Sequence, residues 1–271
     1  MNPKIFEPGK DLKGFVKCYW TLEGTKESTP KNNTIVPDGT MKLIFHYGDL
    51  YWHHPHDSES FLQPRCFLIG QLTRPYIVEP AGDTGTFVVR FHPNGFLPFT
   101  TIPIKEMENK PVPLDSLFGK EGEDLEQKIL KADDTLERID IIESFLLSRL
   151  NNKKVIDQIV RSTIETISTA NGQLSVNELS QQNNLNRRIL ARKFSSSVGL
   201  SPKQLSKIIR LQATLKTLLD QEVPKLTDLA YENEYFDQAH FIKDFKEFTG
   251  LTPKEFYGDD LKMSLIFDGQ D

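Results

Sequence analysis

The sequence predicts an α+β chain of two domains, with a β-rich domain first and an all-helical domain after it. Short runs of alternating apolar and polar residues, broken by prolines and glycines, continue to about residue 118. Apolar residues at helical spacing begin at about residue 124. A chain of 271 residues is long enough for two domains with separate cores. We place the β-rich domain at 1–150, the helical domain at 151–258 and an acidic tail at 259–271.

The strands of the first domain are predicted from their alternation. In the stretch TIVPDGTMKLIFHYGD a turn at 37–39 separates two strands, and TGTFVVRFHPNG contains another. Arg90 lies on the polar side of that last strand, so it faces solvent, an anion or a partner, and we expect solvent. Such short strands with frequent turns are typical of a barrel or a sandwich. The alternating sets are Leu43, Phe45 and Tyr47 against Lys42, Ile44 and His46, and Phe87, Val89 and Phe91 against Val88, Arg90 and His92.

Helical spacing then defines the remaining elements. One stripe within 124–150 consists of Ile139, Ile142, Phe145, Leu146 and Leu150. The polar stretch NNKK at 151–154 breaks the chain, and a helix is expected from Val155 to about Thr169, ended by an Asn-Gly pair. A long apolar helix is expected around LSKIIRLQATLKTLL.

An octapeptide is nearly repeated in the helical half. VGLSPKQL, which begins at Val198, returns fifty-one residues later as TGLTPKEF. Gly199 and Gly250 suit the left-handed turn that ends a helix, and Ser201 and Thr252 suit the cap of the next one. A shorter helix is predicted before each copy, in LSVNELS and in KLTDLA. The sequence therefore predicts two helix-turn-helix units joined by the long helix.

Charge is distributed unevenly along this chain, whose net charge is −5. The first 150 residues hold −5 and the tail −3, whereas residues 151–257 hold +3. No acidic residue lies between Glu178 and Asp220. A basic stretch in an acidic chain predicts a phosphate-binding surface, with a solvated helix face as the alternative. The eight basic residues of the stretch are Arg187, Arg188, Arg192, Lys193, Lys203, Lys207, Arg210 and Lys216.

The chemistry of the repeated unit fits base recognition. Arg188 and Arg192 share one side of their predicted helix. An arginine in the major groove can bond O6 and N7 of guanine, and the small Ala191 lets the backbone approach a base. In the second unit Gln238 can pair with N6 and N7 of adenine. Two such units on one rigid helix suit successive major grooves, about 34 Å apart.

The segment from Leu174 to Tyr257 resembles the DNA-binding domain of the AraC/XylS family of bacterial transcription regulators. NLNRRILARKFSSSVGLSPKQL resembles the first reading helix of that domain, and LAYENEYFDQAHFIKDFKEFTGLTPKEF resembles its signature segment. The resemblance implies DNA contacts from two helices, with His240 touching a phosphate rather than a base. The residues implied are Arg187, Arg188, Ala191 and Arg192 in the first helix, and Gln238, Ala239, His240, Ile242 and Lys243 in the second.

The second unit departs from the family pattern at one turn. Members often have glycine before the second reading helix, where this chain has Glu234. A left-handed glutamate costs about 1 kcal/mol or more, whereas Asn184 in the first unit tolerates that conformation better. Residues 221–257 also hold a net charge of −4. We therefore expect the first unit to supply most of the DNA affinity.

The upstream segments PDGTMKLIFHYGD, GQLTRPYIVEP, VVRFHPNGFLPF and PVPLDSLFG are similar to a β-rich domain that precedes such DNA-binding domains. There it resembles a cupin barrel and binds an effector, forms dimers, or does both. Four aromatic residues are our candidates for an effector pocket, with barrel core as the alternative. They are Trp20, Tyr51, Trp52 and Phe87.

Histidines raise a second class of function. His53, His54 and His56 lie close together in YWHHPHD, and imidazoles at this density can bind zinc, nickel or iron. Their spacing, and that of His92, does not match a cupin metal motif. We favour a polar hairpin loop and predict no metal, no cofactor and no catalytic residue. The alternative is a metal-dependent cupin-type enzyme.

Together these features predict a sequence-specific transcriptional regulator rather than an enzyme. The expected partners are double-stranded promoter DNA, a small-molecule effector, a second copy of the chain and, for an activator, RNA polymerase. An interaction protein whose helical domain does not bind DNA is a further alternative, suggested by the acidic second unit. The start of the sequence has no apolar signal segment and no apolar run reaches membrane length. We therefore expect a cytoplasmic protein without membrane association, with Cys18 and Cys66 reduced.

Overall fold

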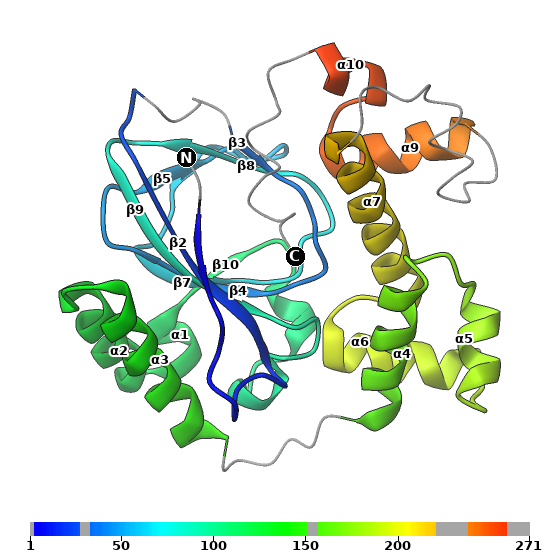
Figure 1. Ribbon diagram of the computed structural model, residues 1–271, viewed down its shortest axis with the longest axis horizontal. Helices are drawn as coiled ribbons and strands as arrows, with labels where there is room; N and C mark the ends of the chain where they lie inside the picture. The colour runs from blue at the N-terminus through cyan, green and yellow to red at the C-terminus, as the bar shows by residue number, and fades with distance from the viewer. Residues whose placement is uncertain (1–2, 28–32, 151–156, 221–237, 259–271) are drawn as a thin grey trace.

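The computed structural model describes residues 3–27, 33–150, 157–220 and 238–258, which form a β-rich part and a helical part side by side (Figure 1). The predicted fold class and the order of strands before helices are confirmed. The helix predicted in KLTDLA and the turn residue Glu234 lie outside the described residues, as does the tail at 259–271.

Two antiparallel sheets make up the β-rich part. The first has the strand order β1-β2-β9-β4-β7-β10 and the second β3-β8-β5-β6. The strands of the first are β1 (Lys4–Phe6), β2 (Val16–Gly24), β9 (Thr84–Phe91), β4 (Lys42–His46), β7 (Cys66–Ile69) and β10 (Pro111–Pro113). Those of the second are β3 (Asn33–Ile35), β8 (Tyr76–Pro80), β5 (Tyr51–His53) and β6 (Phe61–Leu62).

The central strands β4 and β9 are buried on both faces. Leu43 and Val89 belong to a large core that also includes residues of the short helix α1 (Leu114–Phe118) and of α2 (Lys120–Lys131) and α3 (Thr135–Arg149). On the other face, Ile44 packs on a smaller core formed with the second sheet. The 3₁₀ turns η1 (Leu97–Phe99) and η2 (Ile104–Met107) follow β9. Alternate residues of these strands therefore face two different cores, and neither face of the strands is open to solvent.

The helical stretch predicted at 124–150 is two helices rather than one. A break at 132–134 separates α2 from α3, and Asp134 caps α3 by accepting a hydrogen bond from the backbone N–H of Glu137 at 2.9 Å. The predicted apolar stripe lies on the core side of α3: Ile139, Ile142 and Leu146 are buried, while Phe145, and Leu150 just after the helix, are partly buried against the same core.

The second half of the chain is helical in its described residues, as predicted. Its elements are α4 (Gln158–Thr169), α5 (Val176–Gln182), α6 (Arg187–Val198), α7 (Pro202–Asp220), α9 (Gln238–Thr249) and α10 (Pro253–Gly258). Asn171 and Gly172, which end α4, both have positive φ, of 48° and 72°. One core joins these helices and includes Leu190, Phe194 and Phe245.

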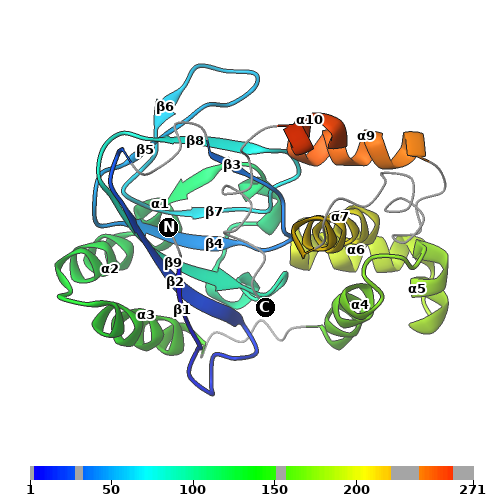
Figure 2. The ribbon, with the colours of Figure 1, turned by 45° about the horizontal axis from the view of Figure 1, so that its top comes forward.

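The helical part docks on the sheets through α6 and α7. Figure 2 shows these two helices on the side that faces the strands, with α5 on the far side. Neither Cys18 nor Cys66 forms a disulfide in the part of the chain that the structure describes. Within the described ranges, every helix is too short or too polar to span a membrane.

Candidate nucleic-acid interface and barrel cavity

The first reading helix, α6, has one buried and one exposed side. Asn186 caps it, because its side chain accepts a hydrogen bond from the backbone N–H of Arg188 at 2.8 Å. Leu190 and Phe194, four residues apart, are fully buried against the helical core. The opposite side presents Arg188 and Arg192, both exposed. The predicted reading residues of this helix therefore lie on its free surface.

This surface of α6 is cationic and is not neutralised within the described residues. Arg187, Arg188 and Arg192 are exposed and form no ion pair with any residue that the structure describes. Ala191 is half-buried beside them, and α6 contains no acidic residue. Neighbouring guanidinium groups repel one another unless an anion lies between them. The surface therefore suits the phosphates and base edges of DNA.

Three of the eight basic residues of the predicted stretch bind partners within the helical domain. Lys193 lies 2.5 Å from the carboxylate of Asp157, and Lys207 lies 2.8 Å from that of Asp244. Arg210 donates a hydrogen bond at 2.8 Å to a backbone carbonyl in the turn after α4. The cationic surface is therefore smaller than the sequence predicts. Its exposed members are Arg187, Arg188, Arg192, Lys203 and Lys216.

The second reading helix, α9, presents most of its predicted contacts at its start. Gln238, Ala239 and His240 are exposed in the first turn, and Lys243 is exposed in the next. Ile242 is half-buried and packs on the core of the helical domain, so only part of its side chain is accessible.

Acidic residues distinguish α9 from α6. Asp244 is 1% exposed and pairs with Lys207 of α7, whose Nζ also lies 3.3 Å from Glu247. Burial favours a lower pKa for Lys207, but its hydrogen bond to Asp244 and the nearby carboxylates raise that pKa above the ordinary value. α9 contains two acids and two lysines, Lys243 and Lys246, and therefore has no net charge. Its electrostatic attraction to DNA is therefore weaker than that of α6.

The turn before α6 has the backbone conformation that the sequence predicts. Asn184 has a φ of 50°, in the left-handed region that asparagine tolerates. Its counterpart in the second unit, Glu234, is outside the described residues, so the strain expected there stays a prediction.

A cavity of about 90 Å³ lies between the two sheets of the β-rich part, with mostly aliphatic and aromatic walls. Of the four residues predicted to form an effector pocket, Trp20 and Tyr51 line this cavity. Trp52 is 42% exposed on the outer face of β5. Phe87 is buried on the opposite face of β9, in the core shared with the helices. The placement of Trp52 and Phe87 in one pocket with the other two is therefore wrong.

Polar groups in the cavity wall bond to one another. His46 Nδ1 lies 3.1 Å from Thr86 Oγ1, and His46 Nε2 lies 3.1 Å from Gln63 Oε1. Gln63 Nε2 donates in turn to the Tyr76 hydroxyl at 3.0 Å. Burial lowers the pKa of His46 to about 4, so its ring is neutral at physiological pH.

Three of the four histidines that suggested a metal have other partners, and the fourth, His56, is exposed. His53 stacks on Tyr76 with ring centroids 3.7 Å apart, and His54 Nε2 lies 3.1 Å from Glu79. His92 bonds a backbone carbonyl elsewhere in the domain. In the part of the chain that the structure describes, no three His, Cys, Asp or Glu side chains are placed to hold a metal ion.

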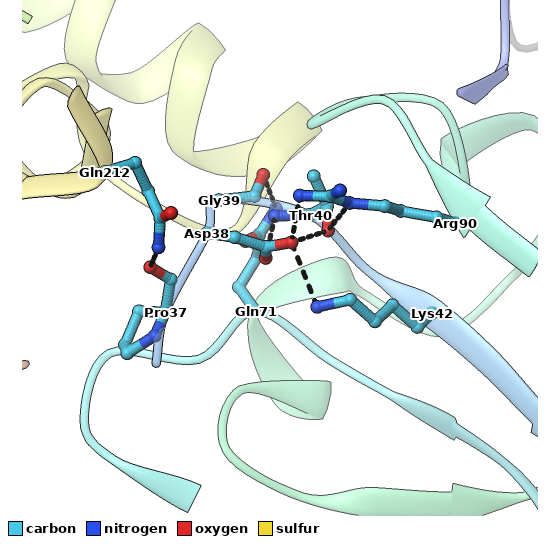
Figure 3. A network of polar contacts seen from close by, with 8 residues as sticks. All are labelled: Pro37, Asp38, Gly39, Thr40, Lys42, Gln71, Arg90 and Gln212. Atoms are coloured by element: carbon cyan, nitrogen blue, oxygen red, sulfur yellow. Dashed lines mark hydrogen bonds and ion pairs between the residues drawn. The ribbon is translucent and has the colours of Figure 1, made fainter. Parts of the chain in front are cut away.

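Arg90 belongs to a buried ionic cluster rather than to the solvent-facing surface that the sequence predicts. It is 7% exposed, and its Nη2 donates to Asp38 Oδ2 at 2.6 Å (Figure 3). The same oxygen lies 3.0 Å from Lys42 Nζ and accepts from the Thr40 hydroxyl at 2.7 Å. Burial alone would raise the pKa of Asp38, but the two cations and the hydroxyl hold it well below its usual range. The expectation failed because the second sheet and the helical domain cover this face.

The turn that this cluster anchors is where the β-rich domain meets α7. Val36 is buried in the core of the helical domain, and Gln212 Nε2 donates to the carbonyl of Pro37 at 2.8 Å (Figure 3). Gly39 has a φ of 74° and lies so close to Leu205 that a Cβ would come within 2.5 Å of that side chain. Backbone atoms of the turn therefore pack directly on the helix.

Sequence reasoning missed Lys42 and Gln63 as cavity residues and Asp38 as the anchor of the turn. A signal was present for the cavity. The face of β4 and β9 that includes Lys42 also includes Ile44 and Val88. Aliphatic residues among polar ones, on strands whose other face is fully apolar, indicate a second interior with polar groups in its wall.

Two families match this chain. Residues 4–113 match a domain of unknown function (DUF6597), and residues 179–258 match a family of helix-turn-helix domains. The second match includes both reading helices and the bridge between them, so the predicted AraC-type helix-turn-helix domain is confirmed.

The chain is also similar to uncharacterised helix-turn-helix-type transcriptional regulators of Staphylococcus aureus. Those of strains MSSA476 and MRSA252 are each 33% identical over 87 residues, which is 32% of this chain and 11% of theirs. The chain thus spans only a small part of the length of these relatives.

Among solved structures, the chain is similar to ToxT from Vibrio cholerae, which is 15% identical, with 91% of this chain and 98% of that one covered and a TM-score of 0.47. ToxT with a bound unsaturated fatty acid is 14% identical, with 93% and 98% covered and a TM-score of 0.45. The C-terminal domain of AraT, a response regulator from Geobacillus stearothermophilus, is 24% identical, with 37% and 84% covered and a TM-score of 0.35.

Proposed function

Because residues 179–258 form an AraC-type helix-turn-helix domain, we propose that this chain is a sequence-specific DNA-binding transcriptional regulator. The observation that supports this most strongly is the exposed side of α6, where three arginines form no ion pair within the described residues. An interaction protein would have no need of an unneutralised guanidinium cluster at this position. A polyanion satisfies that cluster directly.

Each reading helix has a distinct role in this proposal. On α6, Arg188 and Arg192 bond guanine edges, Ala191 allows the backbone to approach, and Arg187 contacts phosphate at the helix start. On α9, the proposed DNA contacts are weaker and are spread over more side chains. Gln238 pairs with adenine, Ala239, Ile242 and Lys243 complete the surface, and His240 contacts phosphate.

Titration of a selected double-stranded operator tests the proposal. We expect Arg188→Ala combined with Arg192→Ala to weaken specific binding by about 2–6 kcal/mol, since each bidentate contact contributes about 1–3 kcal/mol. Lys128→Ala combined with Lys131→Ala, two exposed positions of α2 outside the helical domain, is the matched control and should have little effect. Unchanged operator affinity in the double arginine variant would exclude DNA reading by α6.

We also propose that the β-rich domain binds a small-molecule effector in the cavity between its sheets. The cavity, its apolar walls and its few internally bonded polar groups support this, because such features are typical of ligand sites. An effector alters promoter binding only by favouring one arrangement of the domains over another. Native mass spectrometry of the purified full chain tests the proposal, and a co-purified small molecule lost on Ile44→Trp would support it.

The remaining partners of the proposed regulator follow from its type. A second copy of the chain would allow two operator sites to be bound together, and an activator would also contact RNA polymerase. Its place of action would be the cytoplasm, where promoter DNA lies, and we assign it no catalytic reaction. Sedimentation of the full chain with and without operator DNA tests the dimer.

A further inference from the structure

One side chain belongs both to the cavity and to the contact between the domains. Lys42 lines the cavity, and its Nζ lies 3.0 Å from Asp38 Oδ2 in the turn that docks on α7. Its side chain is only 6% exposed. The polar groups His46 and Gln63, in contrast, bond to one another across the cavity wall. A ligand in the cavity would therefore meet Lys42 as its main charged neighbour.

The size and walls of the cavity limit the ligand. About 90 Å³ between aliphatic and aromatic side chains suits a compact apolar body such as a single ring, not a long chain or a sugar. A buried ammonium group attracts an anion strongly, because the surrounding dielectric is low. An anionic group on the ligand would compete with Asp38 for Lys42.

Resting on the effector function proposed above, we propose that the cavity binds a compact apolar molecule with one anionic group. We further propose that Lys42 transmits this binding to the helical domain by exchanging Asp38 for the anionic group of the ligand.

The structure gives this exchange a direct consequence at the domain contact. Asp38 holds the turn by accepting from the backbone N–H of Thr40 at 3.0 Å as well as from the side chains of the cluster. This turn also holds the Pro37 carbonyl against Gln212 of α7. Because a Cβ on Gly39 would lie 2.5 Å from Leu205, the contact leaves little room for displacement. Loss of the Lys42 ion pair would leave Asp38 bonded to Arg90 and Thr40, and we expect this to loosen the turn from α7.

Matched probes test the anionic class on the full chain. 4-Fluorobenzoate and 4-fluorobenzamide have nearly the same shape and differ in charge, and fluorine NMR measures their binding. We expect the benzoate to bind at least about tenfold more tightly in the natural protein and Lys42→Met to abolish the preference, while Lys105→Met, an exposed control, preserves it. Equal binding of the two probes, no binding of either at about 10 mM, or a preference that survives Lys42→Met would overturn the inference.

A second variant keeps the test readable if Lys42→Met impairs folding. Asp38→Asn leaves Lys42 in place and removes its competitor, so we expect it to bind 4-fluorobenzoate at least a few fold more tightly than the natural protein does. Weaker binding in Asp38→Asn would contradict the exchange.

Hydrogen exchange tests the transmission to α7. We expect saturating 4-fluorobenzoate to speed exchange in the turn around Gly39 and in the half of α7 that contains Leu205 and Gln212. The ligand effect should shrink in Gln212→Leu, whose contact with the turn is already broken. Unchanged exchange in α7 with the benzoate bound would contradict the proposed coupling.

Operator titration of the same preparations separates this inference from the proposed function. Retained DNA binding with a failed benzoate result rejects only this inference, whereas lost DNA binding rejects the proposed regulator function itself.

Discussion

The reading helices α6 and α9 are followed by the same local structure and differ in the surface that they offer to DNA. α6 and α9 are each followed by a glycine of positive φ, Gly199 at 83° and Gly250 at 79°. In each, the hydroxyl that caps the next helix then accepts a hydrogen bond from the backbone three residues on, Ser201 from Gln204 and Thr252 from Glu255. The repeated octapeptide therefore fixes a helix end, a turn and a cap, and says nothing about the exposed face.

That exposed face is where the two helices differ. α6 has basic residues and no acid, whereas the two lysines of α9 are matched by Asp244 and Glu247. Asp244 also binds Lys207, which removes a further cation from the surface. A repeated structural frame thus carries two different electrostatic surfaces, and we assign most of the DNA affinity to the first.

The largest expected effect concerns the buried ion pair between Asp244 of the second unit and Lys207. Lys207→Met leaves the carboxylate of Asp244 buried without its cation, and we expect a loss of about 2–4 kcal/mol in the free energy of unfolding. Urea denaturation measures it. The pair Lys207→Met and Asp244→Leu together should recover much of the loss, and a single variant as stable as the natural protein would show that Asp244 is satisfied by another group.

The next prediction compares single base contacts in the two helices. Arg192→Ala should weaken binding to a selected operator by about 1–3 kcal/mol, the scale of one bidentate contact. Lys243→Ala should cost less, because its helix has no net charge and its approach to DNA is less favourable. Both are measured by fluorescence anisotropy at one salt concentration, and a larger loss for Lys243→Ala would reverse our assignment.

The smallest predicted effect compares the two repeated glycines. Alanine in a left-handed turn costs about 1 kcal/mol at either position. A Cβ on Gly199 would also lie 2.9 Å from Ile104, whereas among the described residues one on Gly250 would meet Pro75 alone, at 3.5 Å. We therefore expect Gly199→Ala to cost about 2 kcal/mol and Gly250→Ala about 1 kcal/mol in thermal or urea unfolding. Equal costs would mean that Ile104 moves aside freely.

These differences also show what the sequence could and could not predict. The turn glycines Gly199 and Gly250 and the caps Ser201 and Thr252 are local features, and each was predicted because the residues that decide them are neighbours in the chain. The internal use of Lys193 and Lys207 depends on acids more than 35 residues away, at Asp157 and Asp244. Such pairings follow from tertiary packing, so the basic stretch was predicted too large.

The cavity shows a partly avoidable error. Tyr51 and Trp52 are consecutive in β5, and consecutive residues of a strand point to opposite faces, so only one of them could line a pocket. Trp20 pairs across the sheet with Val88, another cavity residue, and not with Phe87. That pairing depends on strand register, which a single sequence does not specify. The burial of Arg90 and Lys42 likewise depends on the second sheet and the helical domain.

The measurement that most directly tests the unequal roles of α6 and α9 is the free-energy penalty of every single base-pair substitution across a selected operator. We predict a cluster of positions that cost about 1–3 kcal/mol each in one half-site, and smaller penalties about one helical turn away. The large penalties should disappear at one base pair in Arg192→Ala, with the rest of the profile unchanged. Equal penalties in both half-sites, or large ones that respond to Lys243→Ala and not to Arg192→Ala, would contradict the account.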